Sequence, residues 1–193
     1  MTLDVALPWD WTFAIQNKSR PQYAGGISSL RNSWLNTSPS PFDTVSLPEV
    51  GVSVQENTVV VFLKTALEVS SARWFNRTIT EIVGLMWLPK DWNSYSPKRI
   101  EPKTIEKMLA VLLAILDPDS TPPTVVPTTR GGVQVEWHWN GIDLEIEAFN
   151  SSKLEFFFSG PTGDEEGSIE ADPTTLKRFT HFLKSAYTPS PSI

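Results

Sequence analysis

Residues 131–149, with the sequence GGVQVEWHWNGIDLEIEAF, predict a β-hairpin whose register can be assigned residue by residue. Asn140-Gly141 separates two runs in which apolar and polar side chains alternate. Asn-Gly is preferred in two-residue type I′ turns because both central residues need a positive φ. A two-residue loop brings eight apolar residues onto one face, in the pairs Trp139 with Ile142, Trp137 with Leu144, Val135 with Ile146, and Val133 with Ala148.

The opposite face of this hairpin is polar. It pairs Gln134 with Glu147, Glu136 with Glu145, and His138 with Asp143. Like charges placed directly opposite each other on neighbouring strands are mildly destabilising, so the pair of glutamates requires an explanation. We expect both tryptophans of the first strand to be buried against helices, with these glutamates on the far side of the sheet.

A third strand follows the hairpin. Residues 153–158 alternate again, and a loop of three residues (150–152) places Ala148 opposite Leu154, Ile146 opposite Phe156, and Leu144 opposite Phe158. Every apolar residue then has an apolar partner, so we expect the three strands to form an antiparallel meander. The Gly- and Glu-rich residues 161–171 predict a turn and a short strand around Ile169.

Three segments have the apolar periodicity of amphipathic helices. The first begins near Ser70 or Ser71, either of which can cap it, and ends before Pro89. The second starts at Pro102 and ends at residues 117–118, and the third starts at residues 172–173. The apolar stripes are Trp74, Phe75, Ile79, Ile82, Val83 and Met86; Ile105, Met108, Leu109, Leu112 and Leu116; and Leu176, Phe179, Phe182, Leu183 and Ala186.

Residues 1–70 are expected to be rich in strands and loops, because their Pro, Ser, Asn and Gly content interrupts helices while scattered aromatics argue against disorder. Residues 51–63 predict a second hairpin that pairs Val54 with Val59 and Val52 with Val61. The organisation expected is this N-terminal segment, an α+β core at residues 71–188 and a frayed tail at residues 189–193. The fold class is α+β, an antiparallel β-meander with helices packed on one face.

The amino-acid composition argues against several classes of protein. The chain of 193 residues has no cysteine, which excludes disulfide scaffolds, thiol nucleophiles and thiolate metal sites. Its net charge is −6, with 22 acidic against 16 basic residues and no basic stripe, so a nucleic-acid partner is not expected. No apolar run is long enough to span a membrane, and the first residues lack the features of a signal peptide. We therefore expect a cytoplasmic protein without membrane contact.

Two motifs resemble those of a known family. LPKDWNSYSP at residues 88–97 is similar to a W-D-[SG]-Y-G-A loop, and PTVVPTTRGGVQVEWHWNGIDLEIE at residues 123–147 to a P-x-V-x-P-T-x-x-G-G-[VI]-Q-[LV]-E-W hairpin. Both motifs occur in a family of small, uncharacterised bacterial and archaeal proteins, and the resemblance covers residues 71–150. It implies a prokaryotic origin and no particular activity. Asn93 and Ser96 depart from the loop pattern, which has Asp and Gly there, so a catalytic role for that Asp would not extend to this chain.

The predicted meander gathers candidate binding residues on its polar face. Phe157 on this face indicates that another segment or a partner covers part of it. A solvated outer sheet face shows the same alternation and is the simpler interpretation. In the loop before the second helix, Trp92 and Tyr95 are further candidates for a binding site. The alternative is that this loop is only a connecting turn in which Trp92 packs into the core. The candidates on the sheet are Glu136, His138, Asp143, Glu145, Glu147, Glu155 and Phe157.

The same face offers two kinds of chemistry. Clustered carboxylates bind hard divalent cations, and the metal ligands would be Glu136, Asp143, Glu145 and Glu147. His138 opposite Asp143 resembles a base with its orienting carboxylate, but no serine is predicted nearby, so no catalytic residue is assigned. No phosphate loop, dinucleotide fingerprint or zinc spacing is present, so no cofactor is expected.

These observations favour a non-enzymatic cytoplasmic protein of the accessory, inhibitor or antitoxin type that binds a protein partner. The acidic sheet face favours a partner that is basic. A metal-dependent hydrolase that uses the sheet-face carboxylates and a small-molecule sensor are the alternatives. The oligomeric state and the identity of the partner stay open.

Overall fold

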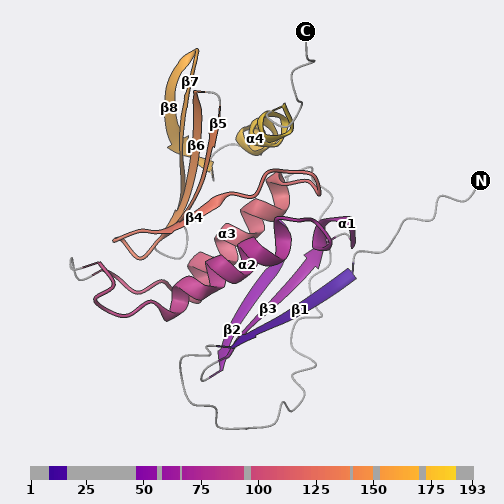
Figure 1. The fold of residues 1–193 in the computed structure, drawn as a ribbon, viewed down its shortest axis with the longest axis vertical. Helices are drawn as coiled ribbons and strands as arrows, with labels where there is room; N and C mark the ends of the chain where they lie inside the picture. The colour runs from indigo at the N-terminus through magenta and orange to yellow at the C-terminus, as the bar shows by residue number, and fades with distance from the viewer. Residues whose placement is uncertain are drawn as a thin grey trace, which may run out of the picture.

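The computed structural model describes residues 9–16, 47–55, 58–65, 67–93, 97–139, 141–149, 153–169 and 173–185. They form two antiparallel sheets with helices between them (Figure 1). The smaller sheet has the order β1-β3-β2, with β1 at Trp9–Gln16, β2 at Val50–Gln55 and β3 at Thr58–Thr65. The larger sheet follows chain order, with β4 at Thr124–Pro127, β5 at Val133–Trp139, β6 at Ile142–Phe149, β7 at Lys153–Gly160 and β8 at Gly163–Ser168. The fold is thus α+β with an antiparallel meander.

The predicted register of the meander is confirmed at every pair. Trp137 lies opposite Leu144 and Glu136 opposite Glu145, and β7 adds Phe156 opposite Ile146. Gly141 has a φ of 75°, as the second central residue of a type I′ turn requires. Asn140, the other turn residue, lies outside the described residues.

Two strands of this sheet differ from the prediction. Residues 124–127 pair with β5 as strand β4, where we expected only a connection. The strand expected around Ile169 lies earlier, at β8, and Ile169 follows it with 4% of its surface exposed. The sequence GDEEGS of β8 has no apolar alternation, because this strand lies at the sheet edge and its residues are almost all exposed.

The hairpin of β2 and β3 is also confirmed, since Val54 pairs with Val59 and Val52 with Val61. The open edge of β2 is covered by the long helix α3 (Pro102–Ile115), whose Glu106 carboxylate accepts a hydrogen bond of 2.9 Å from the backbone N–H of Val52. Such capping satisfies a backbone donor that would otherwise be unpaired at a sheet edge.

The first predicted helix begins later than expected. A short helix α1 (Leu67–Ser70) and a turn precede α2 (Phe75–Gly84), which continues as the 3₁₀ helix η1 (Leu85–Trp87). Trp74 occupies the N-cap position of α2, and no side chain caps this helix. The Trp74 indole is 1% exposed and its N–H donates to the carbonyl oxygen of Asp117 at 2.7 Å, which holds the chain at this point. The last helix, α4 (Pro173–Ser185), begins where Asp172-Pro173 predicts.

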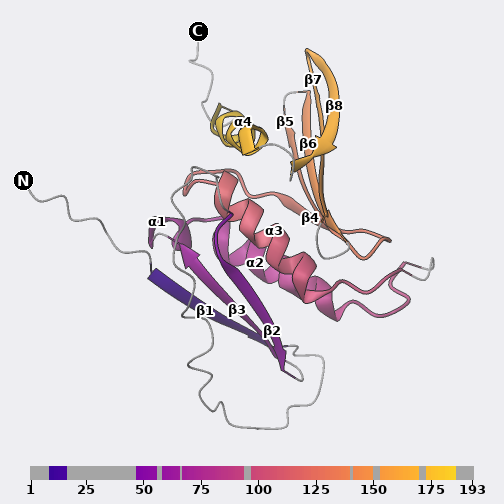
Figure 2. The same ribbon diagram turned by 180° about the vertical axis from the view of Figure 1, so that it is seen from behind.

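Helix α3 lies between the two sheets and shares its buried residues with both (Figures 1 and 2). Val59, Val61 and Leu63 of the smaller sheet belong to the same buried cluster as Val133, Val135 and Trp137 of the larger sheet. Helix α4 covers the same face of the larger sheet, where Phe179 contacts Phe156 at 5.1 Å between ring centroids. One hydrophobic core therefore holds both sheets.

Within the described ranges, no helix combines the length and apolar character needed to cross a membrane.

Trp137 and Trp139 lie on the predicted face but differ in burial. Trp137 is 3% exposed and its indole N–H donates to the carbonyl oxygen of Thr121 at 3.0 Å. Trp139, at the end of β5, is only half-buried, and its ring centroid lies 5.1 Å from that of Phe182 on α4. Burial decreases here because the strand ends beyond the region that the helices cover.

Trp137→Ala should lower the free energy of unfolding by about 3–5 kcal/mol, as deletion of a buried aromatic generally does. Trp139→Ala is the matched control and should cost less, because its side chain is already half-exposed. Chemical denaturation measures both values. Equal losses in the two variants would contradict the difference in burial.

Candidate functional site

The outer face of the larger sheet is the face turned away from α3 and α4 (Figures 1 and 2). Strand pairing assigns its residues, since directly opposed residues point to the same side. No described helix or strand packs over it. We call these residues the outer face: Thr124, Val126, Gln134, Glu136, His138, Asp143, Glu145, Glu147, Phe149, Lys153, Glu155, Phe157, Ser159, Asp164, Glu166 and Ser168.

The outer face is strongly acidic. It carries seven carboxylates, at Glu136, Asp143, Glu145, Glu147, Glu155, Asp164 and Glu166. The cations that accompany them are Lys153 and Arg130, which reaches the face from the loop before β5. With His138 neutral, seven negative charges less two positive charges leave a net charge of −5 on this face. A single sheet face thus holds nearly all of the chain's net charge of −6.

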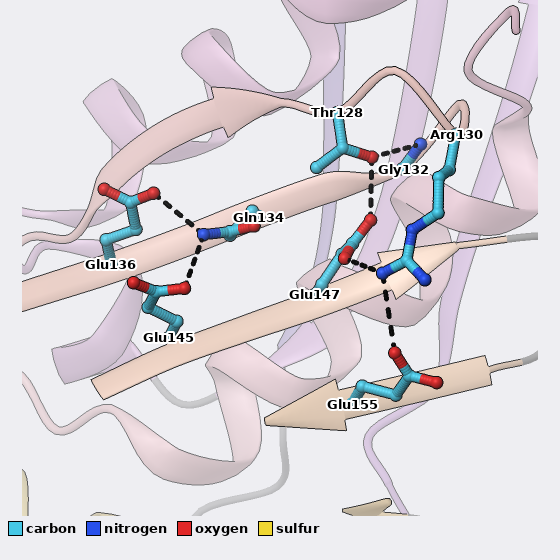
Figure 3. A network of polar contacts seen from close by, with 8 residues as sticks. All are labelled: Thr128, Arg130, Gly132, Gln134, Glu136, Glu145, Glu147 and Glu155. Atoms are coloured by element: carbon cyan, nitrogen blue, oxygen red, sulfur yellow. Dashed lines mark hydrogen bonds and ion pairs between the residues drawn. The ribbon is translucent and has the colours of Figure 1, made fainter. Parts of the chain in front are cut away.

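The side chain of Gln134 lessens the charge repulsion between Glu136 and Glu145, which lie directly opposite each other. Its side-chain amide nitrogen donates a hydrogen bond of 2.9 Å to each carboxylate (Figure 3). The amide therefore bridges the like-charged pair across two strands, although it supplies no positive charge. Burial, together with the charge of Glu136, raises the pKa of Glu145. Among the described residues, the side chain that bonds directly to the Glu145 carboxylate is therefore a neutral amide and not a cation.

Arg130 compensates the other end of the outer face. Its guanidinium donates to Glu147 and lies 3.4 Å from Glu155 (Figure 3). It also stacks over the Phe149 ring at 4.1 Å from the centroid. Phe149 is 6% exposed under this cover. The Thr128 hydroxyl donates to Glu147 at 2.7 Å. One guanidinium therefore compensates part of the charge of two carboxylates at this end of the face.

The loop at residues 128–132 is closely packed, which explains its two glycines. The Gly132 backbone N–H donates to the Thr128 hydroxyl oxygen at 3.1 Å, and a Cβ at Gly132 would lie 2.6 Å from the Glu147 carboxylate. Gly131 has a φ of 82°, and a Cβ there would lie 2.9 Å from the backbone oxygen of Arg99. The glycines allow a close approach that positions Arg130 over the sheet.

His138 lies between two carboxylates on the outer face. Its Nδ1 is 2.7 Å from Asp143, as the predicted pairing requires, and its Nε2 is 3.2 Å from Glu136. The hydrogen bond to Asp143, followed by that to Glu136, raises the pKa of His138 above its ordinary value of 6.5. Since each ring nitrogen faces a carboxylate, neither is placed to take a proton from a hydroxyl nucleophile.

A hollow of about 430 Å³ lies on the outer face over β5 to β8. Phe157 is half-buried in its lining, with Glu145 opposite on β6 and Glu166 opposite on β8. The remaining lining residues are Gln134, Glu147, Glu155, Phe156, Gly167 and Ser168. The aromatic ring that the sequence places on a polar face therefore borders a recess with acidic walls.

The structure brings together seven of the nine predicted site residues on the outer face. Trp92 lies apart, half-buried in the turn after Pro89, where its backbone N–H donates to the Pro89 carbonyl oxygen at 3.2 Å. Tyr95 lies outside the described residues. The sequence did not predict that Arg130, or the β8 carboxylates Asp164 and Glu166, belong to this face. The T-x-x-G-G spacing before β5 is a signal for the first, whereas β8 has no pattern that reveals the second.

The four carboxylates predicted as metal ligands do not converge. Within the part of the chain that the structure describes, no group of three or more histidines and carboxylates is arranged to hold a metal ion. Gln134 separates Glu136 from Glu145, while Glu147 is directed toward Thr128 and Arg130.

Searches against protein-family models, curated proteins and solved structures found no match.

Gly132→Ala should lower the free energy of unfolding by about 1–3 kcal/mol, the usual cost of overpacking, because the new methyl group collides with Glu147 and the backbone oxygen of Ala148. Gly84→Ala is the matched control, since a Cβ at the end of α2 meets nothing within 4 Å and alanine favours helix. Thermal and chemical denaturation compare the two. A neutral Gly132→Ala would contradict the close packing of the loop.

The pKa of His138, measured by NMR titration of its ring protons, should exceed 6.5 and fall in Asp143→Asn, which loses the shorter of the two hydrogen bonds. His138→Gln assigns the signal. Because the pKa is higher in the folded state, this group's contribution to stability is complete below about 6.5 and is lost as the pH rises through the raised pKa. A folded-state pKa of 6.5 or lower would contradict the two-carboxylate geometry.

Proposed function

We propose that this chain is a non-enzymatic cytoplasmic accessory protein that binds a basic protein partner through the outer face. The observation that carries the proposal is the net charge of −5 on a sheet face that no described element covers. Charge complementarity of this kind selects partners and speeds association. An inhibitor or antitoxin that covers a basic surface of its target is the type of protein that fits.

The way in which charge is distributed supports this proposal. Arg130 pairs with Glu147 and Glu155, and His138 lies against Glu136 and Asp143, whereas Glu145 and Glu166 have no ion pair among the described residues. A folded protein gains stability by removing such repulsion, so an uncompensated cluster indicates a requirement other than stability. A cationic partner would supply the missing charge.

Enzymatic alternatives receive less support from the same residues. A metal-dependent hydrolase requires converging ligands, and the carboxylates proposed for that role are bonded individually to protein donors. Both ring nitrogens of His138 contact carboxylates, and these contacts fix the imidazole within the acidic surface. The resemblance of residues 71–150 to small bacterial and archaeal proteins stays a prediction, and under that prediction the partner is a prokaryotic protein.

The test is affinity capture from a lysate of the native organism, with wild-type protein and the double variant Glu136→Gln/Glu145→Gln as baits. The wild type should retain a basic protein at low ionic strength, and the double variant should lose most of it. The variant should fold with an unchanged or slightly higher melting temperature, because it removes a like-charge pair.

The matched control is Glu81→Gln/Glu165→Gln, which removes the same charge from positions off the outer face. Glu81 pairs with Arg77 on α2, and Glu165 points to the opposite side of β8, where it pairs with Arg178. This control should capture the partner as the wild type does. Equal capture by all three baits, or no specific partner with any of them, would refute the proposal.

A further inference from the structure

We propose that the hollow on the outer face is a subsite for an arginine side chain in an extended, basic segment of the partner. This inference rests on the proposed function and specifies the chemistry of the group that the outer face binds. It assigns the floor of the subsite to Phe157 and the walls to Glu145 and Glu166.

The hollow is large enough for an arginine side chain. Its volume of about 430 Å³ lies within the range of about 300–1,000 Å³ that is typical of sites for small ligands. The half-buried Phe157 ring provides an apolar surface for the planar guanidinium or for the methylenes before it. The acidic walls stand directly across the strands on both sides of the ring.

The same sheet already contains one example of this arrangement. Arg130 stacks over Phe149 and lies between the carboxylates of Glu147 and Glu155. Phe157 shares one feature of these surroundings, because Glu155 lies two residues before it on β7 as Glu147 lies two residues before Phe149 on β6. The residues directly opposite differ, since Phe149 faces Lys153 whereas Phe157 has Glu145 and Glu166 on either side. The Phe157 ring is half-exposed, whereas Phe149 is covered by the guanidinium of Arg130.

Two of the four glutamates that line the hollow, Glu147 and Glu155, pair with Arg130, whereas Glu145 and Glu166 have no ion pair among the described residues and would favour a bound cation. The donor to Glu145 is the neutral amide of Gln134, and burial raises the pKa of this carboxyl. Glu166 makes no ion pair with any described residue. Arginine fits better than lysine, because a planar guanidinium both stacks on an aromatic ring and donates to two carboxylates, whereas an ammonium is a compact and strongly hydrated charge.

Two capped peptides test the subsite on the full chain at low ionic strength. They are fluorescein-labelled Gly-Arg-Gly-Arg-Gly-Arg-Gly and its lysine counterpart, and fluorescence anisotropy gives the dissociation constants. The arginine peptide should bind more tightly by about two- to fivefold, the value expected of an exposed cation–π contact. Phe157→Leu should remove this preference, and Phe157→Tyr should keep it.

Neighbouring glutamates provide the charge control. Glu166→Gln should weaken arginine-peptide binding by up to about fivefold, as loss of an exposed ion pair does. Glu165→Gln removes the same charge one residue away on the opposite side of β8 and should leave the affinity unchanged. Melting temperatures of all variants show that each one is folded.

The outcomes separate this inference from the proposed function. An arginine preference that depends on Phe157 and Glu166 supports the subsite. Equal affinities for the two peptides, or equal effects of Glu165→Gln and Glu166→Gln, overturn it. If the subsite fails while capture of the partner still depends on Glu136 and Glu145, the proposed function stands and the contact lies elsewhere on the outer face.

Discussion

The two-residue period of β5 and β6 is the constraint on which the rest of the structure depends. Burying Val133, Val135 and Trp137 against the helices directs Gln134, Glu136 and His138 to the other side. A shift of one residue would place carboxylates in the core, where an unpaired charge is far more costly than the repulsion on the surface. The register that buries the hydrophobic core therefore also fixes which residues form the outer face.

Neutral and cationic hydrogen-bond donors among the carboxylates reduce the repulsion between their charges. An amide bridges the central pair, an imidazole lies at one end and a guanidinium at the other, so that each donor contacts two carboxylates. The compensation is uneven, because the arginine acts on Glu147 and Glu155 while Glu145 receives only an amide. The recess at Phe157 therefore has two kinds of carboxylate in its lining: Glu147 and Glu155, which pair with Arg130, and Glu145 and Glu166, which have no ion pair among the described residues.

Helix α3 connects this surface to the rest of the chain. It contributes buried residues to both sheets, and its Glu106 covers the edge of β2. The loop that carries Arg130 is also held from this side, since the Lys98 backbone N–H, just before α3, donates to the Thr129 carbonyl oxygen at 3.1 Å. The position of the guanidinium over the sheet thus depends on packing that spans the α+β core.

The sequence by itself determined the registers of the meander and the valine hairpin, the positive φ of Gly141, and the starts of α3 and α4. Each follows from a periodic or local signal: alternation, Asn-Gly, or proline in a first helical turn. Tertiary structure alone decided the rest. Strands β4 and β8 form because each pairs with the edge of a neighbouring strand. Trp74 lies before α2 because its indole N–H bonds to the distant carbonyl of Asp117. The amide bridge, the stacked guanidinium and the recess depend on loop closure and side-chain rotamers, which produce no periodic pattern in the sequence.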